Sequence, residues 1–390
     1  MKTSRSIRGK DPHRGLDIEV SYDEAGLVAI RELAPNAARR LPVIAPGFVD
    51  GQVNGYDGLD VNADDLSPET IIALTEKLAM IGVTTWVPTI ITAPEEVIIR
   101  ALGHIAEARR QDSVARAAIP CVHVEGPFIS DRDGPRGVHD ASQVRPLNAR
   151  EVRRWLKASE LVGIITVSPH SPDAPEQIAE IRGLGVEVAI GHTHATPGQI
   201  SAAIASGARL ATHLGNGIAT TLPRHPNALW TQLADDRLTA GIIADGHHLP
   251  AATLKVMIRA KTTERAFLVS DSTALAGSAP GRYRTPVGGI VELASDGRLS
   301  YRGTELLAGA AASLPDGFRN VIRNVGLGFA PALAMVTSTP ARVIPGTRPG
   351  LGKLHVGSPA DIVLLTAEGP EAGTVTAVIQ GGRQVMGDPA

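Results

Sequence analysis

The sequence has very little cysteine and few aromatic residues. Cys121 is the only cysteine among 390 residues, so an intramolecular disulfide is excluded and a reducing cytoplasm is the expected compartment. The charged N-terminal segment is not followed by a long apolar run, which argues against a signal peptide and a membrane span. We therefore expect a cytoplasmic protein with no membrane partner.

The chain also lacks a strong excess of charge of either sign. Its formal net charge is -2 at pH 7, which provides no long-range field for binding nucleic acid or an anionic membrane. An anionic ligand must then be held by local groups. We expect a small-molecule partner and no nucleic acid.

What the sequence does contain is a repeated alternation of short apolar runs and amphipathic segments of helical period, which is typical of β/α units around a parallel sheet. Eight apolar runs predict an α/β fold, a (β/α)8 TIM-like barrel. The predicted strand segments end at Asp50, Thr89, Glu125, His170, His192, His213, Gly246 and Asp271.

The two ends of the chain show a different pattern, with short alternating strands and turns. They predict a small β-sandwich module formed by the N- and C-terminal segments. We expect two domains: the module from residues 1–45 plus 347–390, and the barrel from residues 46–346.

Titratable residues stand at the ends of several predicted barrel strands, where barrel active sites are assembled. Glu125, His192 and His213 form a plausible ligand set for a catalytic divalent metal with an open position for water, and Asp271 is the candidate general base. Each residue alone is better explained as a helix cap or a hydrogen-bonded structural histidine. Their occurrence together at one end of a barrel favours the metal site.

Short motifs spread over most of the chain carry a family resemblance. The sequence resembles the N-acetylglucosamine-6-phosphate deacetylase family of the amidohydrolase superfamily. The matching segments are PGFVDGQVNG (46–55), HVEGPFI (123–129), AIGHTHA (189–195), THLGNGI (212–218), IIADGHHL (242–249), LVSDSTALAG (268–277), LLAGA (306–310) and GSPADIVLL (357–365).

The resemblance implies that Glu125, His192 and His213 bind one divalent metal ion per subunit and that Asp271 is the catalytic acid/base. Zinc is favoured, while Fe, Mn and Co also suit this ligand set. The resemblance further implies hydrolysis of N-acetyl-D-glucosamine 6-phosphate to D-glucosamine 6-phosphate and acetate. It implies a substrate-binding set of Gln52, Val138, His139, Asn216, Gly217, Arg224, His248, Leu307, Ala308 and Gly309.

Arg224 matches the phosphate-binding arginine of the family, which reaches the active site of the neighbouring subunit, so a homodimer is expected. Gly215 and Gly217 stand where the family usually has an aromatic residue and an alanine. Such departures leave other substrates open. The alternatives are the galacto epimer, an unphosphorylated N-acyl amino sugar, and a non-catalytic protein that binds sugar phosphates.

Overall fold

The central element is a sheet of eight parallel strands in a computed structural model that describes residues 4–34, 40–285 and 289–388. The strand order is β14-β13-β12-β11-β10-β9-β8-β5, so neighbours in the chain are neighbours in space. The strands are β5 (Phe48–Val53), β8 (Val83–Ile91), β9 (Val122–Glu125), β10 (Val162–Val167), β11 (Glu187–Ile190), β12 (Leu210–Ala211), β13 (Thr239–Ile243) and β14 (Ala266–Val269).

The sheet closes between its first and last strands. Val53 forms a parallel bridge with Ser272, and the backbone N–H of Asp271 donates to the carbonyl of Gln52 at 2.9 Å. The predicted (β/α)8 barrel is therefore confirmed. Its strands are buried on both faces, as their continuous apolar sequences indicate.

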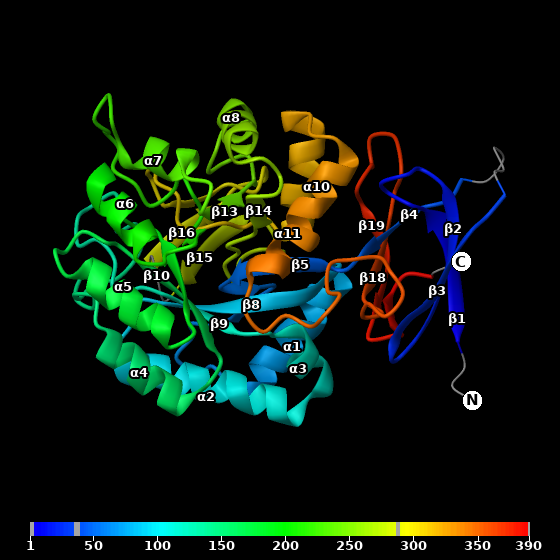
Figure 1. The fold of residues 1–390 in the computed structure, drawn as a ribbon, viewed down its shortest axis with the longest axis horizontal. Coiled ribbons are helices and arrows are strands. Elements are labelled where there is room, and N and C mark those ends of the chain that lie inside the picture. The colour runs from blue at the N-terminus through cyan, green and yellow to red at the C-terminus, as the bar shows by residue number, and fades with distance from the viewer. Residues whose placement is uncertain (1–3, 35–39, 286–288, 389–390) are drawn as a thin grey trace.

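Helices cover the outside of the barrel (Figure 1). Several begin with a side-chain cap that the sequence shows directly: Ser67 accepts from the backbone N–H of Thr70, and Thr196 and Gln199 form a capping box. The helices are α1 (Pro68–Met80), α2 (Glu95–Gln111), α3 (Ser113–Ala118), α4 (Ala149–Ala158), α5 (Ala174–Gly183), α6 (Pro197–Ala205), α7 (Ala228–Ala234), α8 (Ala251–Lys261), α9 (Leu314–Asn320), the π-helix Val321–Val325, α10 (Phe329–Val336) and α11 (Ser338–Val343). None of the described helices combines the length and apolarity needed to cross a lipid bilayer.

The main core lies between the barrel and these helices. Trp155 of α4 is fully buried and stacks on Phe128 with ring centroids 5.5 Å apart. Phe48 of β5 packs against Phe318 of α9 at 5.3 Å. These large side chains join α4 to the loop after β9 and α9 to β5, and so help to fix the outer helices against the barrel.

The terminal segments form one seven-stranded sheet beside the barrel, on the right of Figure 1. Its strand order is β20-β19-β18-β4-β1-β2-β3, so β4 pairs with the N-terminal strand β1 on one side and the C-terminal strand β18 on the other. Buried apolar residues of both halves share one core cluster. The strands are β1 (Arg5–Lys10), β2 (Asp17–Asp23), β3 (Gly26–Glu32), β4 (Val43–Pro46), β18 (Ile362–Leu365), β19 (Val375–Gln380) and β20 (Arg383–Met386).

Two smaller sheets, which the sequence analysis did not predict, complete the described structure. One is the antiparallel sheet of β15 (Gly281–Thr285), β16 (Gly289–Leu293) and β17 (Leu299–Tyr301), inserted after the last barrel strand. The other pairs β6 (Gly55–Tyr56) with β7 (Leu59–Asp60). Both insertions follow strands whose ends lie at the same rim of the barrel.

Candidate active site

The four residues predicted to carry the chemistry meet at one end of the barrel. Glu125 is the last residue of β9. His192, His213 and Asp271 each stand two residues beyond the end of their strand, after β11, β12 and β14. Parallel strands all end at the same rim, so these four side chains from distant parts of the sequence reach one place.

The backbone at three of these residues has an unusual conformation. His192, His213 and Asp271 have φ of 46°, 27° and 48°, in the left-handed region that residues other than glycine rarely adopt. Among the described residues only Asp57 and Thr262 share this feature outside glycine. Because such conformations cost of order 1–3 kcal/mol each, their concentration at one rim marks a functional site.

The imidazoles of His192 and His213 and the carboxylate of Glu125 form a tight group. The two Nε2 atoms lie 2.9 Å apart, and Oε1 of Glu125 lies 3.0 Å from His213 Nε2 and 3.3 Å from His192 Nε2. His192 Nδ1 lies 2.8 Å from the backbone carbonyl of Pro135. That carbonyl requires the ring proton on Nδ1, which leaves the Nε2 lone pair directed at the group.

The electrostatics of this group favour a positive charge at its centre. Burial opposes charge on His213, but the hydrogen bond and the negative charge of Glu125 outweigh it and raise the pKa of His213 to about 9. Burial likewise opposes charge on Glu125, yet the two histidines hold the pKa of Glu125 well below its usual value. Three donor atoms crowded together at full burial thus require a cation or a proton between them.

A divalent metal ion fits this requirement. Donor atoms around a tetrahedral zinc ion are about 3.3 Å apart, given zinc–nitrogen bonds of about 2.0 Å. The three separations observed here are close to that value. One carboxylate and two imidazoles are also the ligand types of catalytic zinc sites that keep an open position.

His139 forms a second possible set with the same carboxylate. A ligand atom of each of Glu125, His139 and His192 falls within 4.8 Å of the others. However, Nδ1 of His139 is engaged by the hydroxyl of Thr92 at 2.8 Å. We favour His213 as the third ligand because its Nε2 is within 3.0 Å of both other donors.

Asp271 is held beside this group by two amides. Its Oδ1 accepts from Nδ2 of Asn54 at 2.8 Å and from Nε2 of Gln52 at 3.0 Å. Gln52 also donates to Oε1 of Glu125 at 3.1 Å, so it bridges the carboxylate of the candidate metal site and the candidate base. Burial, together with the negative charge of Glu125, raises the pKa of Asp271 to about 6. A carboxyl group with such a pKa can both accept and return a proton near neutral pH.

A cavity of about 590 Å³ is lined by Asn54, Glu125, His192, His213 and Asp271. That volume lies within the range of small-molecule sites. The cavity wall is completed by the insertion after β14, through Leu299 of β17 and the segment 305–309. Both apolar and hydrogen-bonding side chains line it, as a ligand with both hydroxyl and methyl groups would need.

Most predicted substrate-binding residues lie at this cavity. The lining includes Val138, His139, Asn216, Gly217, His248, Leu307, Ala308 and Gly309. Gln52 lies behind the lining, and Arg224 is exposed and outside it. Among the described residues of the lining there is no lysine or arginine.

The chain matches the family described as "Amidohydrolase family" over residues 43–385. It belongs to the amidohydrolase family. It is accordingly a hydrolase that acts on a carbon–nitrogen bond.

Individual relatives of this amidohydrolase are amino-sugar phosphate deacetylases. It is 31% identical to the N-acetylgalactosamine-6-phosphate deacetylase of Escherichia coli O157:H7, over 87% of this chain and 88% of that protein. It is 32% identical to the N-acetylglucosamine-6-phosphate deacetylase of Bos taurus, over 83% of this chain and 79% of that protein. The N-acetyl-D-glucosamine-6-phosphate deacetylase mutant of Mycobacterium smegmatis, solved in complex with N-acetyl-D-glucosamine-6-phosphate, superimposes with a TM-score of 0.85, at 27% identity and over 98% of this chain and 100% of that one.

Several residues that position the site of this amidohydrolase were missed from the sequence. Asn54 orients Asp271, Thr92 orients His139, and Asp245 holds Nδ1 of His248 through Oδ2 at 2.6 Å. Asn54 carried a signal, because it stands two residues after Gln52, directly beyond the end of the first barrel strand. Thr92 and Asp245 are ordinary loop residues whose partners appear only in three dimensions.

Proposed function

We propose that this amidohydrolase removes the acetyl group of N-acetyl-D-glucosamine 6-phosphate, giving D-glucosamine 6-phosphate and acetate. The observation that carries the proposal is the convergence of Glu125, His192 and His213 to within 3.3 Å of one another, beside Asp271, at one cavity. The similarity to amino-sugar phosphate deacetylases, one of them solved with this ligand, supports the choice of substrate. Release of acetate by the purified enzyme tests it.

In this proposal Glu125, His192 and His213 bind one divalent metal ion per subunit, with zinc as the favoured ion and Fe, Mn or Co as alternatives. When bound, such an ion supplies Lewis-acid activation of water and of the acetamide carbonyl. Gln52 keeps the carboxylate of Glu125 in place from behind. Its role is therefore one of positioning, because Gln52 lies behind the lining of the cavity and not at the substrate contact that the resemblance implied.

Asp271 moves the proton. Its Oδ1 is occupied by the two amides, so Oδ2 is the oxygen that takes the proton from the attacking water. The water oxygen forms a bond to the acetyl carbon, the carbon–nitrogen bond breaks, and Asp271 passes the proton to the departing amine. Acetate and a free amino sugar result.

The remaining residues of the cavity are proposed to hold the sugar. His139 and His248 face it from opposite loops, Asn216 and Gly217 follow β12, and Leu307, Ala308, Gly309 and Val138 add backbone and apolar contacts. Gly217 is required for the close approach of its loop, since a Cβ at this position would lie 2.8 Å from Nδ1 of His192.

A phosphate group needs a cation that the described lining of the cavity does not supply. Arg224 is exposed and makes no hydrogen bond or ion pair within the described part of the chain. We propose that Arg224 binds the phosphate in the active site of a second subunit of a homodimer. A guanidinium suits this task because it engages phosphate oxygens through two parallel N–H groups.

We further propose that the enzyme is cytoplasmic, as its single cysteine suggests.

Replacing Arg224 by Ala is expected to raise KM for the phosphorylated substrate by roughly 10- to 100-fold, the loss of charge-assisted hydrogen bonds. The KM for unphosphorylated N-acetylglucosamine should stay near that of the wild type. Steady-state kinetics with both substrates provide the measurement. Equal effects on both would mean that Arg224 acts through assembly or stability instead of phosphate binding.

The galacto epimer is a second candidate substrate, because relatives of 31% and 32% identity are N-acetylgalactosamine-6-phosphate deacetylases. Comparing kcat/KM for the two epimers, each with and without phosphate, decides between them. Turnover of neither, with ligand still bound, would favour a non-catalytic sugar-phosphate-binding protein.

Replacing Asp245 by Asn is expected to raise KM roughly 10-fold with little change in kcat. The carboxylate of Asp245 accepts from Nδ1–H of His248, and its other oxygen accepts from the backbone N–H groups of His247 and His248. An amide that keeps the two backbone contacts would direct its own N–H at Nδ1, so the imidazole would lose the hydrogen bond that orients it. His247→Asn is the matched control, because His247 lies outside the lining and contacts the carbonyl of Asp296. An unchanged KM in the Asp245 variant would remove His248 from substrate binding.

We also infer that the barrel, residues 46–346, and the terminal module, residues 1–45 plus 347–390, are separate domains. In support, β4 belongs to the terminal sheet and β5 to the barrel, with only Gly47 between them. A Cβ at Gly47 would lie 2.1 Å from Oγ1 of Thr84, so the crossing between sheets is too tight for any other residue. Residues 1–3, 35–39 and 389–390 of the module lie outside the described part of the chain.

A further inference from the structure

A second cavity, of about 800 Å³, lies at the opposite end of the barrel. Strand β13 reaches from one cavity to the other: Thr239 at its start lines the second cavity, and Ile243 at its end lines the catalytic cavity. Arg265, directly before β14, lines the second cavity, and Asp271, just after that strand, belongs to the active site. The two cavities are therefore separated by the length of the barrel strands.

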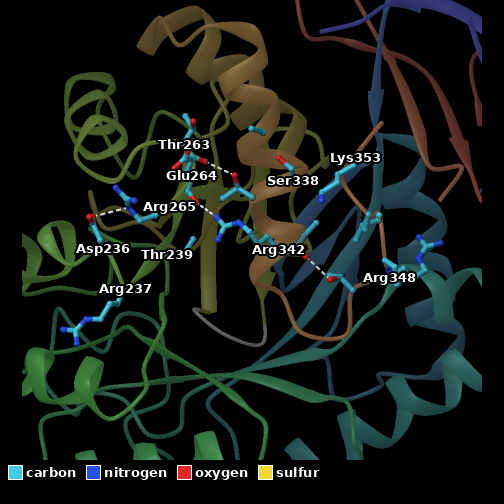
Figure 2. A pocket seen from close by; sticks show the side chains of 17 residues that line it. Asp236, Arg237, Thr239, Thr263, Glu264, Arg265, Ser338, Arg342, Arg348 and Lys353 are labelled. Atoms are coloured by element: carbon cyan, nitrogen blue, oxygen red, sulfur yellow. Dashed lines mark hydrogen bonds and ion pairs between the residues drawn. The ribbon is translucent and has the colours of Figure 1, made fainter. Parts of the chain in front are cut away.

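The second cavity is rich in basic side chains, and we call it the basic groove (Figure 2). Five basic residues line it, against the two acidic residues Asp236 and Glu264. The basic residues are Arg237, Arg265, Arg342, Arg348 and Lys353.

Three of these cations are already paired with carboxylates. Arg237 lies 2.6 Å from Asp235, and Figure 2 shows its side chain extending away from the others at the lower left. Arg265 lies 3.2 Å from Asp236, and Arg348 pairs with the buried Asp361. These three contribute mainly to the walls of the groove.

Arg342 and Lys353 are different. Arg342 donates to the backbone carbonyl of Glu264, which does not neutralise its charge. Lys353 makes no ion pair or hydrogen bond through its ammonium group with any residue that the structure describes. The groove therefore holds donors that an added anion would satisfy.

The wall that carries Arg348 and Lys353 is held in a defined shape. Gly352 has φ of 72°, and a Cβ there would lie 2.6 Å from the carbonyl of Thr337 at the junction of α10 and α11. Oγ1 of Thr347 donates to the carbonyl of Ala341 at 2.9 Å. This segment is thus fixed against α11 before any ligand arrives, which lowers the entropic cost of binding.

We propose that the basic groove binds a phosphate-bearing small molecule, with Arg342 and Lys353 as its main cationic contacts. A guanidinium and an ammonium together match the charge of a phosphate, and the hydroxyls of Thr239, Thr263 and Ser338 line the same groove as further donors. The volume suits a small phosphorylated metabolite. This site is distinct from the phosphate contact proposed for Arg224.

Calorimetric titration with pyrophosphate at moderate ionic strength tests the proposal. The background is the full-length Arg224→Ala variant, which removes the proposed phosphate contact of the active site. In that background Arg342→Gln combined with Lys353→Gln should weaken binding by roughly 10- to 100-fold, since charge-assisted hydrogen bonds are lost. Arg237→Gln is the matched control: it removes a paired cation from the same groove and should change affinity by less than about 5-fold.

Both Arg342 and Lys353 are exposed, so their variants should fold, and unchanged melting temperatures would show it. Pyrophosphate binding that is equal with and without the Arg342 and Lys353 substitutions would overturn the proposal. So would the absence of binding in the Arg224→Ala background, or equal losses from the double substitution and from Arg237→Gln.

Discussion

Replacing Asp271 by Asn is expected to lower kcat by roughly 100- to 10,000-fold, the usual contribution of general acid–base catalysis. The amide is almost the same size and still accepts from Asn54 and Gln52 through Oδ1. It cannot, however, take a proton from water. Steady-state release of acetate, together with metal analysis of the purified variant, gives the measurement.

Asn54→Ala is the control for this experiment. It removes one hydrogen bond to Oδ1 but leaves the carboxylate, so it should cost only roughly 10-fold in kcat. Metal content should equal that of the wild type in both variants. A rate near wild type for Asp271→Asn would exclude Asp271 from the proton transfer.

Replacing His213 by Ala is expected to remove the metal and, with it, almost all turnover. Loss of a residue that only hydrogen-bonds to a metal-ligating side chain usually lowers metal affinity by 10- to 100-fold, on the order of 1–3 kcal/mol. Loss of a metal-ligating side chain itself should therefore lower the affinity further. The variant also leaves the Glu125 carboxylate buried with one fewer partner. Metal content after dialysis and acetate release measure the two effects.

His139→Ala separates the two possible ligand sets. If Glu125, His192 and His213 bind the metal, this variant retains it and shows a raised KM. Retention of metal by His213→Ala with its loss from His139→Ala would instead assign His139 as the third ligand, as its proximity to the other two allows.

The sequence predicted which titratable residues meet at the rim better than it predicted the contacts that position them. Glu125, His192, His213 and Asp271 were found because strand period and strand direction place every strand end at one rim, whatever lies between. Contacts such as Thr92 with His139 depend on how separate loops fold over that rim. No periodic pattern records them.

The three-stranded sheet of β15, β16 and β17 shows a second limit. Only Val291, Leu293 and Leu299 are buried apolar residues of these strands, and the other positions are largely charged or exposed. So little burial produces a weak alternating pattern beside the strong apolar runs of the barrel. Arg224 shows a third limit, since its proposed contact depends on a second copy of the chain.

The position of β4 has a consequence for how the protein is made. As the ribosome extends the chain, residues 43–46 emerge early, but their partner Ile362–Leu365 is synthesised only after the entire barrel. Until then one edge of β4 has no antiparallel partner, and Ile44 lacks Ile362 and Leu364 from its apolar surroundings. A chain that terminates prematurely before residue 362 therefore has the whole barrel sequence but an unpaired edge on β4. That edge is expected to bind chaperones and to promote aggregation.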